Sequence, residues 1–312
     1  GFGFLSENEN FAQQVIDRNI VWIGPKPNLI KSMGNKDIAR ELALKSNIPI
    51  CPGISNITKL NSDDLKNKCE NIGYPLLVKS SAGGGGIGMS VVQNFKDLSK
   101  SIEKTSNLAE KSFGNGDVFI EKFITNARHI EIQIFGFGDK GAVHLYERDC
   151  SMQRRYQKII EESPAPEIDR TLIESMANAA VKLSSDVKYQ GAGTVEFIYD
   201  VEQKKYYFLE MNTRIQVEHP VTELVTNNDL VSMQINFAFN RKNKFLKQEK
   251  ISIYGHSIEC RVYAEDPSKN FLPSPGKISK LTFPKVPNGI RLDWGYDEND
   301  DVSFYYDPMI GK

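Results

Sequence analysis

The sequence has no apolar run near the roughly 20 residues that a membrane-spanning helix needs, and no excess of charge of either sign. Its 39 Lys and Arg residues balance 40 Asp and Glu residues, so nothing in the charge favours binding to nucleic acid or to a membrane surface. The four cysteines form no CxxC pair and the four histidines have no zinc-ligand spacing. These absences argue against a disulfide framework and a zinc site, and the cysteine usage fits a reducing compartment. With 40% hydrophobic residues, the chain is predicted to be globular with a core to bury.

The most informative segment is EMNTRIQVEHP, residues 210–220. In an extended strand, the even positions of this segment share one face and the odd, mostly apolar positions share the other. The even positions are Glu210, Asn212, Arg214, Gln216 and Glu218. Such a row can ligate a metal, hold an anion and move a proton, so it predicts a reaction centre on a rigid strand. An amphipathic strand with a solvated polar face is the alternative.

The segment upstream, GTVEFIYD at 193–200, also alternates, and the polar VEQKK that follows it predicts a hairpin. If the turn centres near Gln203, Glu196 falls opposite Glu210, with the Cβ atoms about 5 Å apart. Two carboxylates about 4 Å apart repel by roughly 4 kcal/mol at an effective dielectric of about 20, so the pair needs a raised pKa or a cation. With Asn212 beside it, the pair favours a hard cation such as Mg²⁺. A turn offset by one residue would keep the two glutamates apart.

A glycine-rich loop lies in YPLLVKSSAGGGGIGMSVVQN, residues 74–94, between a strand that carries Lys79 and a second strand, MSVV. Glycine backbone can approach and cradle phosphate oxygens. Gly83, Gly85 and Gly88 satisfy GxGxxG, but the dinucleotide fingerprint requires a helix after the loop, and no Walker A or protein-kinase motif is present. The segment therefore predicts a phosphate-binding loop of another type. A flexible hairpin would explain the glycines but not the lysine.

Together with other motifs, these segments resemble those of the biotin carboxylase component of biotin-dependent carboxylases, which belongs to the ATP-grasp superfamily. The resemblance covers essentially all of the chain. The order and spacing of many motifs carry the resemblance. They are GFGFLSEN at Gly1, VWIGP at Val21, MGNK at Met33, the lysine and glycine loop, VFIEKFI at Val118, RHIEIQIFG at Arg128, ERDCSMQRRYQK at Glu147, PAP at Pro164, GAGTVEF at Gly191, EMNTRIQVEHPVTE at Glu210, ECRVYAEDP at Glu259, FLPSPGKI at Phe271 and YYDPMIGK at Tyr305.

The resemblance implies an α+β protein with an ATP-grasp fold, built on a mainly antiparallel sheet and truncated at both ends. Residues 1–24 would be a remnant of the N-terminal Rossmann-like (pre-ATP-grasp) domain, 25–50 a linking helical segment, 51–123 the lid or B domain, and 124–312 an incomplete ATP-grasp and C-terminal platform. Apolar residues from Leu29 to Leu44 predict a helix over 28–46 that ends before Pro49.

The resemblance also implies roles residue by residue. The ATP contacts are expected at Lys36, Lys79, Gly83, Gly84, Gly85, Gly86, Glu121, Lys122, Ile124, His129 and Gln153. The Mg²⁺ (or Mn²⁺) ligands are expected to be Glu196, Glu210 and Asn212. The bicarbonate pocket would consist of Lys158, Arg214, Gln216, Val217 and Glu218. The catalytic groups would be Glu218 as general base, Arg214 and Lys158 as anion holders, and Arg261 as the group that stabilises a biotin enolate.

The implied reaction is ATP-dependent carboxylation of protein-linked biotin by bicarbonate, through carboxyphosphate. The expected partners are a biotin carboxyl carrier domain and a carboxyltransferase component, in a homodimer or larger complex, in the cytoplasm or the mitochondrial matrix. The acceptor would be an acyl-CoA such as acetyl-, propionyl- or methylcrotonyl-CoA.

Four positions depart from the family pattern, which usually has glycine at Ala82, a basic residue at Ile87, histidine at Tyr156 and tyrosine at Phe2. The first two bear on how firmly the loop clamps phosphate. Three other functions stay open on the sequence alone. They are a different ATP-grasp ligase such as a carbamoyl-phosphate synthetase half, a non-catalytic nucleotide-binding module, and an inactive fragment that only folds or assembles.

Overall fold

The structure is a computed structural model that describes residues 1–81, 88–239, 246–283 and 289–312. Two compact units divide the chain, Gly1–Ser257 and Ile258–Lys312. Among the described residues, none of the helices combines the length and the apolar character needed to cross a bilayer.

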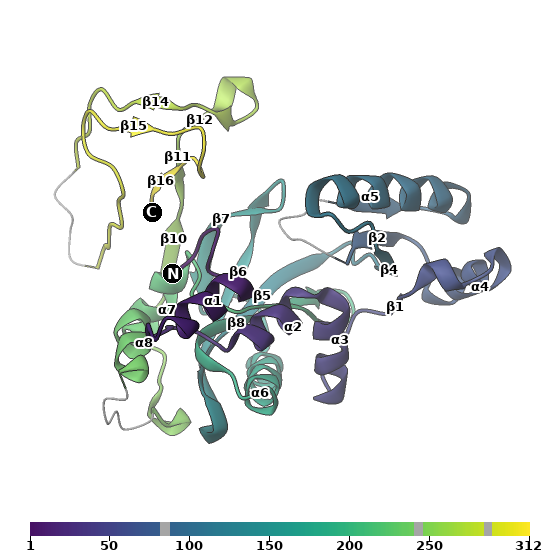
Figure 1. Cartoon of the computed structure of the whole chain (residues 1–312), viewed down its shortest axis with the longest axis horizontal. Helices are drawn as coiled ribbons and strands as arrows, with labels where there is room; N and C mark the ends of the chain where they lie inside the picture. Colours follow the sequence, from purple (N-terminus) through teal and green to yellow (C-terminus); the bar gives the residue numbers. More distant parts are fainter. Residues whose placement is uncertain (82–87, 240–245, 284–288) are drawn as a thin grey trace. The chain divides into compact units, whose positions relative to one another are not determined.

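The first unit contains both helices and strands, which occur partly in runs of one kind (Figure 1). Its helices are α1 (Glu9–Asp17), α2 (Pro27–Gly34), α3 (Lys36–Lys45), α4 (Ser62–Ile72), α5 (Leu98–Phe113), α6 (Arg170–Asp186), α7 (His219–Thr226) and α8 (Leu230–Ala238). Its strands are β1 (Gly53–Ile54), β2 (Leu76–Ser80), β3 (Met89–Val92), β4 (Val118–Lys122), β5 (Ala127–Phe137), β6 (Ala142–Arg154), β7 (Gln157–Ser163), β8 (Gln190–Asp200) and β9 (Lys205–Asn212). Strand β10 (Ser257–Cys260) begins at the last residue of this unit.

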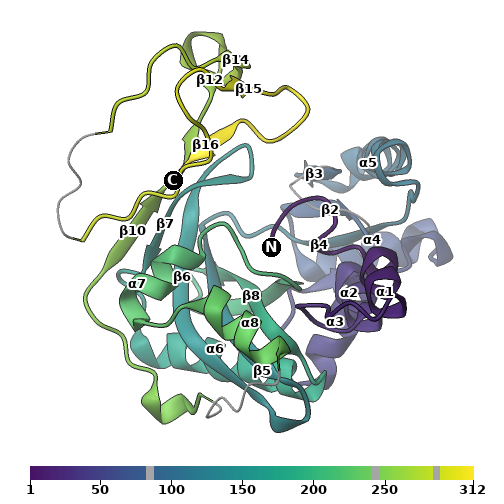
Figure 2. The same cartoon turned by 60° about the vertical axis from the view of Figure 1, so that its left-hand side comes forward.

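Within the first unit, the central sheet has the strand order β7-β6-β5-β8-β9, and each neighbouring pair among these five strands is antiparallel. Because successive side chains in a strand point to opposite faces, Ile130, Ile132 and Ile134 of β5 lie on the face that packs against α6 (Figure 2). Apolar residues of α6, among them Met176 and Leu183, complete this core. The opposite face of the same strands carries polar side chains and, beside them, a second apolar cluster that includes Phe135 and Leu145.

The hairpin β8–β9 confirms the predicted register. Residues 201–204 form the turn, and Glu196 is the direct partner of Glu210. The register shifts immediately after this pair, so that Phe197 faces Phe208. The two glutamates therefore lie on the same face of the sheet, as the alternation indicates.

A smaller antiparallel sheet, in the order β1-β4-β2-β3, forms the part of the chain predicted to be the lid. Leu76 and Val78 pack with Ile120 against apolar residues of α4 and α5, and Figure 1 shows α5 running alongside this sheet. Lys79 occupies the alternate position on β2, so it points to the face away from this core. The glycine-rich loop joins β2 to β3, and Gly83, Gly84, Gly85 and Gly86, with Ala82 and Ile87, lie outside the described residues.

The single helix predicted over 28–46 is instead two helices, α2 and α3, so that prediction is wrong. The break is at Asn35, whose backbone is extended (φ −92°, ψ 114°) and whose side chain accepts a hydrogen bond from Ile38 N. An asparagine that caps the following helix satisfies an otherwise unpaired N–H, and this outweighs the continuity of the apolar pattern.

The strand predicted over 210–220 is also wrong beyond Asn212, where β9 ends. Thr213 N donates to Glu7 Oε1, and helix α7 begins at His219 with Pro220 in its first turn. Proline has no N–H to give to a sheet but fits the first turn of a helix. Glu210 and Asn212 therefore lie on the strand, whereas Arg214, Gln216 and Glu218 reach the sheet from the segment between β9 and α7.

The second unit consists of short antiparallel pairs. They are β11 (Val262–Tyr263) with β16 (Met309–Gly311), β12 (Glu265–Asp266) with β13 (Leu272–Pro273), and β14 (Gly276–Lys277) with β15 (Asp301–Val302). Trp294 packs edge-on against Phe283 with ring centroids 5.2 Å apart.

A close backbone approach on β5 gives a test of the central sheet. A Cβ at the buried Gly136 would lie 2.2 Å from Tyr189 O, so we expect Gly136→Ala to destabilise the protein by about 1–3 kcal/mol. Gly34, at the end of α2, has nothing within 4 Å of a Cβ, so Gly34→Ala should leave stability unchanged or raise it by up to about 1 kcal/mol. Urea unfolding of both variants measures the difference, and equal midpoints would contradict it.

Candidate active site

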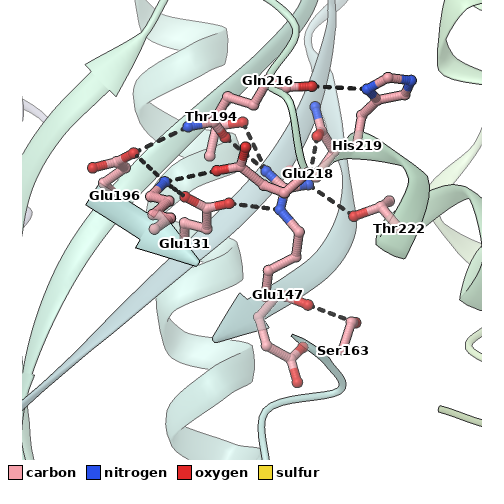
Figure 3. A network of polar contacts seen from close by, with 12 residues as sticks. Glu131, Glu147, Ser163, Thr194, Glu196, Gln216, Glu218, His219 and Thr222 are labelled. Carbon is pink, nitrogen blue, oxygen red and sulfur yellow. Dashed lines mark hydrogen bonds and ion pairs between the residues drawn. The ribbon is translucent and has the colours of Figure 1, made fainter. Parts of the chain in front are cut away.

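Polar and charged side chains lie together on part of the face of the central sheet opposite α6, and each strand from β5 to β9 supplies at least one. They are His129, Glu131 and Gln133 of β5, Arg148 of β6, Lys158 of β7, Thr194 and Glu196 of β8, and Glu210 and Asn212 of β9. Residues 213–222 add Gln216, Glu218 and Thr222 from the loop and α7 (Figure 3). The structure therefore brings together most of the residues predicted for metal and bicarbonate.

Lys158 lies at the centre of three carboxylates. Its Nζ is 2.6 Å from Glu131 Oε2, 2.9 Å from Glu196 Oε1 and 2.8 Å from Glu218 Oε1. Burial alone would lower the pKa of Lys158, but the three carboxylates raise this pKa well above its usual range. Lys158 is therefore charged and holds the proposed base, Glu218, beside Glu196.

Arg148 is fully buried and makes hydrogen bonds to several members of the same network. Its Nε donates to Glu131 Oε1 at 2.6 Å, and its terminal nitrogens donate to Gln216 Oε1 at 2.7 Å and to Thr222 Oγ1 at 2.8 Å. Gln133 and Thr194 accept its other hydrogen bonds. The planar fork of arginine thus ties the sheet to the segment that carries Gln216 and Glu218.

The facing glutamates have opposite pKa shifts. Burial, and then the negative charge of Glu196, raise the pKa of Glu210. Burial opposes ionisation of Glu196 too, but Lys158 and His129 hold its pKa well below the usual range. Asn212 Nδ2 donates to Glu196 Oε1 at 2.7 Å. The buried Glu196, its half-buried cross-strand partner Glu210 and the carboxamide of Asn212 offer the oxygen donors that suit Mg²⁺ or Mn²⁺. A divalent cation would offset the repulsion by Glu196 that adds to the effect of burial on the pKa of Glu210.

His129 and Gln153 lie at the edge of this cluster. His129 Nε2 is 3.0 Å from Glu196 Oε2, although it is not aligned for a hydrogen bond, and His129 Nδ1 is 2.9 Å from Gln153 Nε2. Burial would lower the pKa of His129, but the charge of Glu196 raises it above its ordinary value of 6.5. The charge of His129 therefore depends on its contact with Glu196.

Arg214 lies just beyond the end of β9. Its Nε donates to Glu7 Oε2 at 2.9 Å, its Nη2 to Asn212 Oδ1 at 3.1 Å and its Nη1 to Ile215 O at 3.3 Å. A cavity of about 510 Å³ lies next to it, lined by residues 1–6 as well as by Trp22 and Thr213. Phe2, one of the departures from the family pattern, is part of this lining.

On the smaller sheet, Lys79 Nζ is 2.9 Å from Glu121 Oε1, and Arg40 Nη1 is 3.2 Å from Glu121 Oε2. All three side chains are buried, and the Phe119 ring lies beside both cations. Lys36 is the first residue of α3, where burial lowers its pKa while the charge of Glu210 opposes that shift. Its electrostatic neighbours therefore include Glu210, Lys79 and Glu121.

The other expected residues have varied surroundings. Lys122 Nζ donates to the carbonyls of Gly73 and Tyr74, both at 3.0 Å, and Ile124 is buried. Val217 is half-buried in the turn before α7, and Arg261 belongs to the second unit. The glycines at 83–86 lie outside the described residues, so their contact with phosphate stays a prediction.

Four residues of the network were not predicted from the sequence: Arg148, Glu131, Gln133 and Glu7. A signal for two of them was present, because the motif RHIEIQIFG alternates strictly and puts His129, Glu131 and Gln133 on one face. Arg148 lies between two other charged residues, in the sequence ERD, and no alternation of polar and apolar residues there indicates that its side chain is buried. Glu7 lies more than 200 residues from its partners, beyond the reach of any local pattern.

Three family models match the chain. The model described as the ATP binding domain of the carbamoyl-phosphate synthase L chain matches residues 35–245. The biotin carboxylase N-terminal domain matches residues 1–30, and the biotin carboxylase C-terminal domain matches residues 259–312.

Known proteins resemble the chain over its whole length. It is 47% identical to biotin carboxylase 1 of Bacillus subtilis (strain 168), covering 100% of this chain and 69% of that protein. It is 45% identical to the mitochondrial methylcrotonoyl-CoA carboxylase subunit alpha of Dictyostelium discoideum, of which it spans only 44%. Among solved structures, the biotin carboxylase domain of the 2-oxoglutarate carboxylase of Hydrogenobacter thermophilus, a dimer in complex with MgADP, ADP and bicarbonate, is 42% identical, with a TM-score of 0.91 and coverage of 100% of this chain and 68% of that one.

The pKa of His129 provides a test of the charge arrangement. Burial and Lys158 lower this pKa and Glu196 raises it, so Glu196→Gln should shift the His129 titration to lower pH. In the wild type, a pKa above 6.5 means that His129 stabilises the fold below pH 6.5 and that this contribution is lost as pH rises through the folded-state pKa. Ring NMR signals followed against pH measure the shift, and His144, whose pKa burial lowers, is the internal control. An unmoved His129 titration in the variant would refute the assignment of Glu196 as its main partner.

Proposed function

The chain belongs to the biotin carboxylase family of ATP-grasp ligases, and we propose that its site performs that family's ATP- and Mg²⁺-dependent carboxylation of protein-linked biotin by bicarbonate. The observation that carries the proposal is the contact between Lys158 Nζ and Glu218 Oε1 at 2.8 Å. Glu218 follows Gln216, which is hydrogen-bonded to the same network, and Arg214 lies four residues before Glu218. A cation beside a carboxylate is what holding and deprotonating a small oxyanion requires.

Bicarbonate would bind between Lys158 and Arg214, with Gln216 and Val217 completing the pocket. Arg214 keeps N–H groups on both terminal nitrogens after its contacts with Asn212 and Ile215. Glu218 would take the proton of bicarbonate, so that a bicarbonate oxygen attacks the γ-phosphorus of ATP and ADP leaves. The product is carboxyphosphate.

Carboxyphosphate would then break down to CO₂ and phosphate. The phosphate takes the N1′ proton of biotin, and N1′ attacks CO₂ to form carboxybiotin. Arg261 is proposed to stabilise the negative charge on the ureido oxygen during this step. The role of Arg261 rests on the match of ECRVYAEDP to the family.

Glu196, Glu210 and Asn212 would hold the Mg²⁺ or Mn²⁺ ion, which supplies charge neutralisation at the β- and γ-phosphates when bound. Around that position, Lys158 and Gln216 donate to Glu196 Oε1 and fix its carboxylate. These hydrogen bonds hold the carboxylate of Glu196, a proposed metal ligand, in one orientation before a nucleotide phosphate binds.

The nucleotide would lie between the two sheets of the first unit. We assign Lys79 and Lys36 to the phosphates, together with Gly83, Gly84, Gly85 and Gly86. Glu121, Lys122 and Ile124 are assigned to the adenine end, and His129 and Gln153 to the ribose and phosphates. The side chains of Glu121 and Lys122 are engaged with protein partners, and so are the N–H groups of Lys122 and Phe123. The backbone of Ile124 is therefore the better candidate for reading adenine.

A carbamoyl-phosphate synthetase half is the alternative that the match at residues 35–245 raises. Two observations disfavour it: biotin carboxylase models match on both sides of this region, and the biotin carboxylases match the whole chain. An inactive fragment is the other alternative, because the chain spans 69% of one relative and 44% of another.

The acyl-CoA acceptor and the assembly would be properties of a whole carboxylase. We propose a biotin-dependent carboxylase with a carrier domain and a carboxyltransferase, since the methylcrotonoyl-CoA carboxylase subunit is among the relatives. A homodimer or larger complex is proposed as well. The compartment would be the cytoplasm or the mitochondrial matrix.

Lys79→Gln tests the nucleotide site. The substitution keeps a hydrogen-bonding side chain but removes the charge, and losing one charge-assisted phosphate contact should weaken ATP binding by about 1.5–3 kcal/mol, roughly 10- to 150-fold in Kd. Isothermal titration calorimetry with ATP and Mg²⁺ measures the change. Lys59→Gln, on the same lid at an exposed position, is the control. An unaltered Kd in a folded Lys79 variant would exclude Lys79 from the phosphate site.

Glu218→Gln and Arg214→Ala separate chemistry from binding. In the full-length enzyme, Glu218→Gln should keep ATP binding and lower bicarbonate-dependent ATP hydrolysis with free biotin by about 10²–10⁴, the usual contribution of a positioned base. Arg214→Ala should mainly raise the KM for bicarbonate, because it removes an anion-holding cation. Near-normal turnover of Glu218→Gln would end the base assignment. A wild-type enzyme without bicarbonate-dependent turnover would end the proposed function itself.

A further inference from the structure

Glu7 reaches into the site from the opposite end of the chain. Its Oε2 accepts a hydrogen bond from Arg214 Nε at 2.9 Å. Its Oε1 accepts from Thr213 N at 2.9 Å and from Thr213 Oγ1 at 3.2 Å. One carboxylate therefore holds two consecutive residues of the site, one by its side chain and the other partly by its backbone.

These contacts occur where the chain leaves the central sheet. Strand β9 ends at Asn212, so Thr213 N is the first amide that needs a partner outside the β-ladder, and Glu7 supplies it. The following residues bend toward Arg148 and Lys158, where Gln216 and Glu218 make their hydrogen bonds. Glu7 thus stabilises the bend as well as the arginine.

Glu7 itself is held in place by the helix that follows it. Asn8 is the N-cap of α1, and its side chain accepts a hydrogen bond from Phe11 N at 2.7 Å. A capped helix start fixes the backbone immediately before it. The carboxylate of Glu7 is therefore presented from a defined position.

The three contacts of Arg214 fix the plane of its guanidinium. Glu7 takes the Nε side, while Asn212 Oδ1 and Ile215 O each take one N–H of a terminal nitrogen. The remaining terminal N–H groups then point in a defined direction, in the fork geometry that suits a small planar oxyanion. Without Glu7, the Nε side has no carboxylate to lock the rotation of the side chain.

We propose that Glu7 is a positioning residue for the anion site: it orients Arg214 for bicarbonate and does not touch the substrate. This inference rests on the proposed role of Arg214 in bicarbonate binding. The side chains of Glu7 and Arg214 are 39% and 24% exposed, so the ion pair contributes little to global stability. Its effect is on geometry, where a misplacement of about 1 Å can cost up to about 10²-fold in rate.

The first experiment compares Glu7→Gln with Glu9→Gln in the full-length enzyme. Glu7→Gln keeps the size and an acceptor oxygen for Thr213 but loses the charge that holds Arg214, so the KM for bicarbonate should rise about 10-fold or more while the KM for ATP stays within about twofold. Glu9 lies two residues away in the first turn of α1, and its variant should behave as wild type. Glu7→Asp, which keeps the charge but shortens the reach, should fall between the two. An unchanged KM for bicarbonate in Glu7→Gln, or an equal rise in the KM for ATP, overturns the proposal.

A double-mutant cycle distinguishes action through Arg214 from general damage. If Glu7 acts only by orienting Arg214, Glu7→Gln should add nothing to the KM for bicarbonate in an Arg214→Ala background. Full additivity would overturn the proposal. Thermal unfolding of each variant shows whether the fold is retained, and activity of the wild type establishes the proposed function separately, so failure of one is distinguishable from failure of the other.

Discussion

The arrangement of the site depends on the mutual neutralisation of charges buried on one face of a sheet. Arg148 and Lys158 share Glu131, and Lys158 also pairs with Glu196 and Glu218. Taking such groups out of water is costly, and only their direct contacts offset that cost. Each member is therefore held in place by the others, because any displacement would leave a buried charge unpaired. The positions of the reactive groups are fixed before a substrate binds, which is what electrostatic catalysis requires.

The two faces of the central sheet have different roles. The face toward α6 is apolar and tightly packed, with Ile132, Val195 and Met176 fully buried, so the strands form a rigid base. The polar face then uses that rigidity, because a side chain on a packed strand has little freedom to move. Arg214 lies outside the regular part of the sheet, and its geometry depends on Glu7, from the N-terminal segment, instead.

Local patterns in the sequence predicted several elements because they are encoded by neighbouring residues. The alternation in 193–200 and the polar turn after it determine the partner of Glu196, since the side-chain period of a strand is two and a one-residue slip would expose the apolar face. The strands on either side of the glycine-rich loop follow from the same rule. The apolar periodicity at 28–46 was misleading, because a single capping asparagine, Asn35, divides the one predicted helix into two.

By itself the sequence determined the strands of the hairpin, the facing glutamates and, through its motifs, the family. Only the tertiary structure decided that the chain leaves the sheet at Thr213, that Arg148 joins β6 to Gln216 and Thr222, and that Glu7 holds Arg214. The physical reason is the separation along the sequence over which each effect acts. Periodicity and capping act over a few residues, whereas a buried charge is satisfied by whichever partner the fold brings within hydrogen-bonding distance, and no local pattern specifies a partner more than 200 residues away.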